Sequence, residues 1–226
     1  MSPLRWALTA VNLLVWPALI LWLGGDPRWI EGWIFSLWFV GLCGTTVVWL
    51  ARKDPELLAE RFRKPGTGGQ SRRDQAIVYL IGIGFVAWTI LLGLDGRRFR
   101  WTPRLPVAAE VLGAAMLAGA AFFIFRAFAD NTFTSPLARI QKERGHRVVS
   151  TGVYGMVRHP MYLGAILMFA GGALLCGSLA ALAAAAGLAG ALAVRIGVEE
   201  ALLVAELEGY AEYRKRVRWR LVPHVW

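Results

Sequence analysis

Long uncharged runs alternate with short polar stretches along this chain. Three runs without Asp, Glu, Lys or Arg are each close to the length that an α-helix needs to cross a membrane: residues 6–24, 32–51 and 75–94. A fourth apolar run covers about 105–128, with charges only near its ends. Residues 159–194 are also uncharged and too numerous for one helix. We expect a helical hairpin there, bent at 176–178, and about six transmembrane helices in all, or five if one of the pair is short.

The composition agrees with this pattern. Of the 226 residues, 57% are hydrophobic and the mean hydropathy is +0.49, which is more apolar than an ordinary soluble domain. The first apolar run follows Arg5 as a signal peptide would, but no small-x-small cleavage site follows it, so we expect it to be retained. The expected fold is all-α: one polytopic membrane domain over 1–226, with four N-terminal helices in 1–128 and a cytosolic cofactor-binding region in 129–226.

The net charge of +10 is distributed unevenly. Lys and Arg number seven in loop 51–73, five in loop 129–158 and five in the tail 206–226, against five in the opposite loops, mainly in 97–104. The positive-inside rule then places both termini in the cytoplasm. Basic loops beside anionic lipid headgroups need no nucleic-acid partner. The Ala-, Gly- and Arg-rich composition favours a bacterial inner membrane.

The sequence shows no pattern typical of a disulfide framework, a metal site or a soluble nucleotide-binding domain. Cys43 and Cys176 both lie in apolar runs, and the three histidines lack metal-ligand spacing, so we expect neither a disulfide framework nor a metal. There is no P-loop and no GxGxxG motif. Loop 51–73 has the pattern of a short amphipathic helix before a Pro/Gly turn, but a solvated interfacial connector is our preferred interpretation.

Polar residues become specific in the segment "GVYGMVRHPMYLG", residues 152–164. One interpretation is structural: Pro160 starts a helix, Arg158 reaches the headgroups, and the tyrosines are interfacial. The other is a binding site, because the start of a helix presents free N–H groups that suit an anion. The two interpretations differ in whether these residues act singly or together.

Taken together, these groups describe one ligand. His159 can form hydrogen bonds in its neutral or charged form near pH 7. Tyr154 and Tyr162 offer aromatic faces to an adenine or a sulfonium cation. Glu199 and Glu200 can hold an ammonium group. An amino acid joined to adenosine, with a cation between them, is S-adenosylmethionine.

A second polar cluster follows the last apolar run. Arg195 and Glu199 are four residues apart, so on a helix they lie on one face and can pair. Charges at membrane depth are usually paired and functional. A surface ion pair at a helix end is an equally good interpretation of these two residues alone.

Three segments in order, "GVYGMVRHPMYLG", "RIGVEE" and "GYAEYRKRVRWRLVP", resemble the isoprenylcysteine carboxyl methyltransferase family and its phospholipid N-methyltransferase relatives. These are integral-membrane enzymes, and the resemblance covers about 129–226. It implies S-adenosylmethionine as cofactor, S-adenosylhomocysteine as product, and a lipid-like or lipidated acceptor that enters from the bilayer.

The resemblance also assigns residues, which we combine with the chemistry above. The expected cofactor-binding residues are Gln141, His146, Arg147, Val148, Val149, Tyr154, His159, Pro160, Met161, Tyr162, Glu199 and Glu200. The expected catalytic residues are Arg195, beside the acceptor, and Glu199. Tyr210, Tyr213 and Arg220 would hold the C-terminal segment over the pocket.

The acceptor stays open between a prenylcysteine-type carboxylate, an amine such as a phospholipid headgroup, and another hydrophobic molecule. A free carboxylate is already nucleophilic, whereas an amine must lose a proton, for which Glu199, Glu200 and His159 are the candidate bases.

Two other classes remain as alternatives. Sterol reductases of this architecture would use NADPH and place Asn where this chain has Met161, which argues against reduction. Another departure is Val153, where many relatives have Pro. A non-enzymatic transporter or lipid-binding protein would show repeats and polar residues within its spans. Here Asn12 is a rare polar residue among the early apolar runs.

Overall fold

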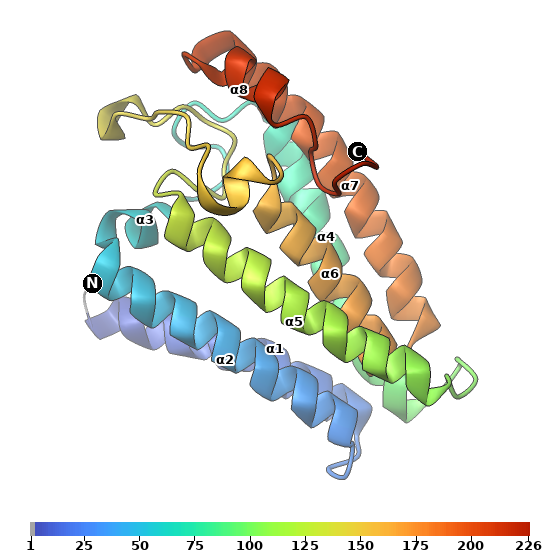
Figure 1. Cartoon of the computed structure of the whole chain (residues 1–226). Coiled ribbons are helices and arrows are strands. Elements are labelled where there is room, and N and C mark those ends of the chain that lie inside the picture. The colour runs from blue at the N-terminus through green and yellow to red at the C-terminus, as the bar shows by residue number, and fades with distance from the viewer. Residues whose placement is uncertain (1–2) are drawn as a thin grey trace.

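Every regular element of the computed structural model, which describes residues 3–226, is a helix. The long helices are α1 (Pro3–Gly24), α2 (Ile30–Lys53), α4 (Arg72–Gly93), α5 (Val107–Asp130), α6 (Pro160–Leu175) and α7 (Leu179–Glu206). The short ones are α3 (Pro55–Glu60), α8 (Tyr210–Arg216), the π-helical turn η1 (Leu94–Arg98) and the 3-10 turns η2 (Lys142–Arg144) and η3 (Gly152–Gly155). α3, α8 and the long loop before α6 gather at one end of the bundle, and the connections α1–α2, α4–α5 and α6–α7 lie at the other (Figure 1).

The all-α polytopic fold is confirmed. Five helices (α1, α2, α4, α5 and α7) are long and apolar enough to cross a membrane, α4 together with the π-helical turn η1 that continues it. α6 has 16 residues, which at about 1.5 Å per residue span about 24 Å, less than a typical hydrocarbon core. The hairpin therefore has one short arm, and its bend lies at 176–178 as expected.

Local sequence signals explain where the helices begin. The side chains of Asp54, Ser71 and Ser178 accept hydrogen bonds from first-turn N–H groups of α3, α4 and α7. Pro160 occupies the first turn of α6, where its missing N–H costs nothing. α7 differs from expectation because it continues past residue 194 to Glu206, so its polar residues belong to the membrane helix itself.

Glycines bring α5 and α6 into close contact. A Cβ atom at Gly113 would lie 2.7 Å from the carbonyl oxygen of Gly171, and one at Gly171 would lie 2.9 Å from that of Gly113. A Cβ at Gly164 would lie 2.7 Å from Ile124. Small residues allow membrane helices to pack backbone to backbone. This packing fixes the start of α6 against the end of α5, where the polar loop between them begins.

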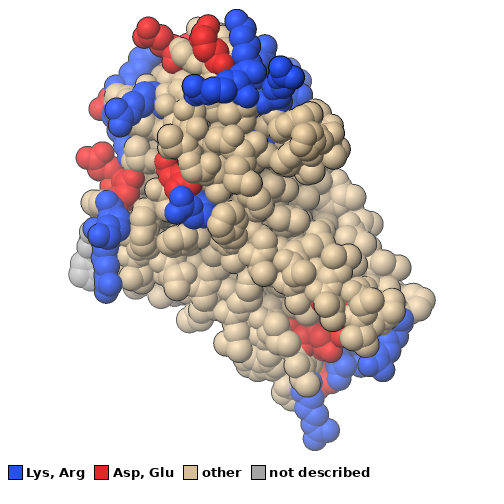
Figure 2. Space-filling view, viewed as in Figure 1, with Lys and Arg blue, Asp and Glu red and all other residues tan. Residues whose placement is uncertain are grey.

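The surface has an apolar middle and charged ends (Figure 2). Large apolar side chains lie open on the outer faces of the long helices, among them Trp22, Leu37 and Ile83, which are 71%, 67% and 68% exposed. Such surface is unusual in a soluble protein but suits contact with lipid. The expectation of an integral membrane protein agrees with this distribution.

Candidate functional site

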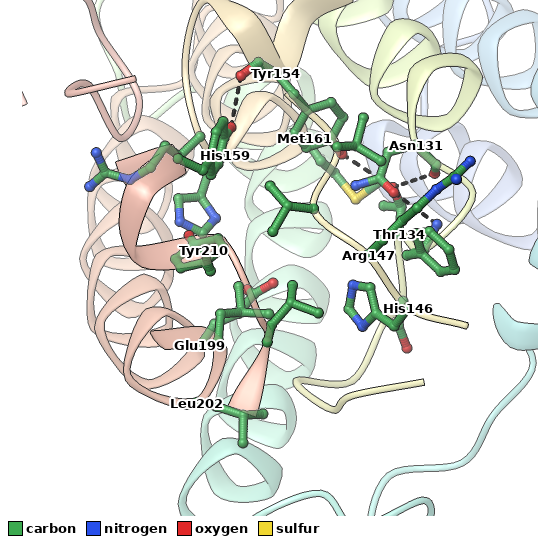
Figure 3. Close-up of a pocket in the computed structure, with 18 of the residues that line it drawn as sticks. Asn131, Thr134, His146, Arg147, Tyr154, His159, Met161, Glu199, Leu202 and Tyr210 are labelled. Atoms are coloured by element: carbon green, nitrogen blue, oxygen red, sulfur yellow. Dashed lines mark hydrogen bonds between the residues drawn. The ribbon is translucent and has the colours of Figure 1, made fainter. Parts of the chain in front are cut away.

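A hollow opens at the end of the bundle that carries the long loop. It is formed by residues 131–159, the start of α6, the last turns of α7, and α8 (Figure 3). Its space, counting the open mouth, is about 800 Å³. Most of the residues expected at a cofactor site line it: His146, Arg147, Val148, Val149, Tyr154, His159, Pro160, Met161, Tyr162 and Glu199.

Gln141 lies behind the hollow instead of on its wall. It is fully buried, donates a hydrogen bond to the carbonyl of Phe133 at 2.6 Å, and accepts one from Arg144 at 2.6 Å. Its backbone N–H contacts Nδ1 of His146 at 3.3 Å. These contacts hold the loop in shape.

Glu200 also lies outside the lining. Its carboxylate is buried. Oε1 accepts a hydrogen bond from Nε of Arg158 at 2.6 Å and lies 3.2 Å from Nε2 of His159, and Oε2 accepts from Nε of Arg220 at 3.0 Å. With these partners already in place, it is poorly suited to hold a ligand's ammonium group. Glu200 therefore ties α6, α7 and the C-terminal segment together.

The C-terminal segment is attached by its backbone as well. The N–H groups of Arg158 and His159 donate to the carbonyls of Trp219 and Arg220, each at 2.9 Å. Both residues precede Pro160, the first residue of α6, so the expectation that the first turn of this helix offers free N–H groups stays a prediction. From α8, Tyr213 donates its hydroxyl to the carbonyl of Tyr154 at 2.7 Å. The expected attachment through Tyr213 and Arg220 is confirmed.

Tyr162 and Glu199 form the polar centre of the hollow. The Tyr162 hydroxyl donates to Oε2 of Glu199 at 2.6 Å. The His159 ring lies parallel to the Tyr162 ring, with centroids 5.5 Å apart, and Cζ of Arg195 lies 5.7 Å from the centroid of that ring. No protein partner bonds the other oxygen, Oε1 of Glu199, within residues 3–226. The site thus holds one carboxylate oxygen fixed and leaves one available.

The expected ion pair between Arg195 and Glu199 does not form. Nε of Arg195 donates to Oδ1 of Asp74 on α4 at 2.9 Å, and Nη2 donates to the carbonyl of Pro136. Asp74 is fully buried and its other oxygen accepts from the N–H of Ala138 at 3.0 Å. A carboxylate from a neighbouring helix neutralises Arg195, because packing α4 against α7 brings the two side chains together.

The interpretation of loop 51–73 as a solvated connector is wrong for its first part, which forms the short helix α3, whereas residues 61–73 are largely exposed. Leu57 and Leu58 of α3 are buried, and Glu60 is 4% exposed. Both oxygens of Glu60 accept from Arg139, at 2.9 and 3.1 Å. Burial works against ionisation of Glu60, but Arg139 and the other donors prevail and keep its pKa below the usual value. The loop before α4 is therefore a support for one wall of the hollow.

His146 is a neutral group in that wall. Its ring stacks on Phe133, with centroids 4.7 Å apart. Burial lowers the pKa of His146 to about 4. Because Nδ1 accepts from a backbone N–H, the ring proton is on Nε2. Figure 3 shows His146 and Glu199 on opposite sides of the hollow.

Several residues of the site gave no signal in the sequence. Asp74 reads as an ordinary acidic residue in the first turn of a helix, and Glu60 as part of a surface loop. Thr134 lies 3.1 Å from the Tyr154 hydroxyl, oxygen to oxygen, and burial raises the pKa of Tyr154 to about 12. Only the position of these groups relative to distant helices reveals what they do.

Residues 108–208 match the sequence model of the phospholipid methyltransferase family. The match begins within α5, contains the loop and α6, and ends just after α7. It confirms the resemblance to integral-membrane methyltransferases of this group and supports methyl transfer as the class of activity. No curated protein matches the chain. Within residues 3–226, no three His, Cys, Asp or Glu side chains are grouped so as to hold a metal ion.

Proposed function

We propose that this chain is an S-adenosylmethionine-dependent membrane methyltransferase whose acceptor is a lipid-like or lipidated molecule that enters from the bilayer. The observation that carries the proposal is the hollow itself, where Glu199 and Tyr162 meet within the segment that matches a methyltransferase family. When bound, the cofactor supplies a methyl group activated by a sulfonium. The protein must bind the cofactor and the acceptor, position them and exclude water.

The residues of the hollow fit such a cofactor chemically. The free oxygen of Glu199 suits an ammonium or ribose hydroxyl group. Leu202 and Leu203 on α7, with Val148 opposite, provide an apolar wall for an adenine ring. The N–H of His146 Nε2 is a donor for a ring nitrogen or a carboxylate. The hollow offers both a carboxylate and aromatic faces, the two features that a cationic amino-acid nucleoside needs.

Methyl transfer from a sulfonium is an in-line displacement that depends on position and on exclusion of water. Tyr162 is held in one orientation by Glu199, His159 and Arg195. Arg195 is thus a positioning residue in this proposal, since Asp74 already neutralises its charge. A carboxylate acceptor would need no base. For an amine acceptor, His159 remains the candidate base, because Glu200 is fully engaged and the free oxygen of Glu199 is assigned to the cofactor.

The proposal places the hollow at the cytoplasmic face of a bacterial inner membrane, with both termini on that side. This rests on charge: loops 51–73 and 129–158 and the tail 206–226 hold most of the Lys and Arg residues, and positive charge favours the cytoplasmic side. A soluble cofactor would then enter from the cytosol and a hydrophobic acceptor from the bilayer.

Calorimetry on the detergent-purified protein tests this function. We expect micromolar binding of S-adenosylmethionine and S-adenosylhomocysteine and none of NADPH. Glu199→Gln should weaken this binding by at least about 10- to 100-fold, whereas the matched variant Glu206→Gln, at the exposed end of α7, should retain it. Binding of NADPH alone would move the protein to the reductases. Failure of all three to bind would leave the 152–164 motif as a helix start at a membrane surface.

A further inference from the structure

Arg61, at the C-terminal end of α3, is a cation without a counterion. The neighbouring arginines all have carboxylate partners: Arg63 and Arg139 pair with Glu60, and Arg195 pairs with Asp74. Within residues 3–226, the side chain of Arg61 forms no hydrogen bond or ion pair. Its guanidinium lies over the ring of Phe128, whose centroid is 5.1 Å from Cζ of Arg61.

The fold holds this cation in place. Leu57 and Leu58 are buried against α2 and α5, and the backbone N–H of Arg61 donates to the carbonyl of Leu57 at 3.1 Å. Phe128 belongs to the same apolar cluster, next to Met161 of the hollow. The guanidinium is therefore held against an apolar cluster that also contacts Met161, a residue of the hollow's wall.

The electrostatics of this position are unfavourable for an unpaired charge. Burial, with repulsion from Arg195, lowers the pKa of Arg61 to about 10, so it stays charged at neutral pH. Tyr162, Tyr154 and the neighbouring Glu60 favour the charge of Arg61 but do not outweigh the effect of burial on its pKa. A poorly solvated cation normally has an anionic partner, because leaving it alone costs free energy. Arg52, by contrast, is an exposed arginine at the end of α2 that water and headgroups can solvate.

We infer that Arg61 binds the anionic group of the methyl acceptor, a phosphate or a carboxylate. A guanidinium can take either through two parallel N–H···O bonds. This role, expected from the sequence for Arg195, fits Arg61 better because the charge of Arg195 is already matched by Asp74. The inference rests on the proposed function, since it makes Arg61 the residue that selects an anionic acceptor at the same site.

Binding of short-chain probes to the purified protein in neutral-lipid nanodiscs tests this inference. Dihexanoyl phosphatidic acid, which has a phosphate but no ammonium group, is compared with dihexanoylglycerol, and N-acetyl-S-farnesylcysteine with its methyl ester. We expect the anionic member of one pair to bind more tightly than its neutral analogue. The pair that shows this preference identifies the anionic group of the acceptor as a phosphate or a carboxylate. Arg61→Met should weaken that member by about 10- to 100-fold, the worth of a charge-assisted contact. Arg52→Met should leave it unchanged.

A second readout needs no acceptor. Removing an unpaired cation should raise the Tm of the ligand-free protein by about 2–4 °C in Arg61→Met, as surface-charge repairs do in other proteins. S-adenosylmethionine affinity should stay at the wild-type value, which shows that the variant is folded. Should Arg61→Met fail to fold, Arg61→Lys keeps the charge, loses the two-pronged contact and should weaken the probe by several-fold.

The inference is overturned if neither anionic probe is preferred over its neutral analogue, or if Arg61→Met keeps the preference. Equal losses in Arg61→Met and Arg52→Met would show a general attraction to headgroups. Wild-type protein that binds S-adenosylmethionine but shows no anion preference contradicts only the role of Arg61. Wild-type protein that does not bind S-adenosylmethionine contradicts the proposed function.

Discussion

An acidic side chain lies at each end of α7, and the two differ in how many hydrogen-bond partners the protein gives them. Near its start, the buried carboxylate of Asp95 accepts hydrogen bonds from Ser178 at 2.6 Å, from the N–H and hydroxyl of Thr102 at 2.7 Å each, and from the N–H of Ala180 at 3.2 Å. Near its other end, Glu199 has one protein partner, Tyr162. A saturated buried carboxylate joins elements together, whereas a half-satisfied one in a hollow is available to a ligand.

Adjacent residues repeat the contrast within one turn. Glu200 resembles Asp95, because three cationic or imidazole groups occupy its oxygens. Glu199 points to the hollow instead. Two carboxylates that are adjacent in the sequence can therefore differ in function. The number of protein partners that each one already has indicates whether it joins elements together or can bind a ligand.

The largest expected effect comes from Arg195→Ala. It leaves Asp74 as an unpaired buried charge, so we expect a loss of about 3–5 kcal/mol in the free energy of unfolding. Denaturant titration in detergent measures this loss. The double variant Arg195→Met with Asp74→Leu should recover much of it while turnover stays absent. Unchanged stability in Arg195→Ala would show that Arg195 and Asp74 do not pair.

The second largest effect is expected at the start of α7, where the hydrogen-bond acceptors of Asp95 are all used. Asp95→Ala leaves buried donors of Ser178 and Thr102 unsatisfied, which should cost about 2–3 kcal/mol of stability. Affinity for S-adenosylmethionine should be unchanged, because this end lies far along α7 from the hollow. A loss of affinity without a loss of stability would reverse the comparison.

The opposite pattern is expected for Glu199→Gln. Stability should change by no more than about 0.5 kcal/mol, because glutamine keeps an acceptor for Tyr162. Affinity for S-adenosylmethionine should fall by at least about 10- to 100-fold, since a charged partner is lost. Calorimetry beside thermal unfolding separates the two quantities. A stability loss as large as that of Asp95→Ala would make Glu199 a structural residue.

The smallest effect is a pH dependence from His146. Its folded pKa of about 4 lies below its ordinary value of 6.5, so the folded state favours the neutral ring. Stability should be complete above about pH 6.5 and decline as pH falls toward 4, because the unfolded chain takes up a proton first. We expect a decline of about 1 kcal/mol after solvent screening. His146→Phe, which keeps the stacking on Phe133, should flatten the decline between pH 6.5 and 5, and an unchanged slope would assign it to other groups.

Hydropathy and motif spacing were sufficient to predict most of the helices and many of the residues that line the hollow. Continuous apolar runs predict helices because only a helix satisfies its backbone in lipid, and Ser71, Ser178 and Pro160 mark helix starts by local hydrogen bonding. The motif from Tyr154 to Tyr162 lines the hollow as expected. Periodicity could not show that loop 51–73 supports the site, since its few apolar residues are buried by packing with α2 and α5.

The sequence by itself determined the class of protein: a membrane bundle with a methyltransferase-like second half and a charged end. Only the tertiary structure decided which polar groups meet. Arg195 binds Asp74 across 121 positions and Arg139 binds Glu60 across 79. Arg61 forms no ion pair within residues 3–226 and lies over the ring of Phe128. The physical reason is that burial makes ionic groups pair with whichever opposite charge the helix packing brings within reach. Neighbours in the chain, such as Arg195 and Glu199, need not be the ones that meet.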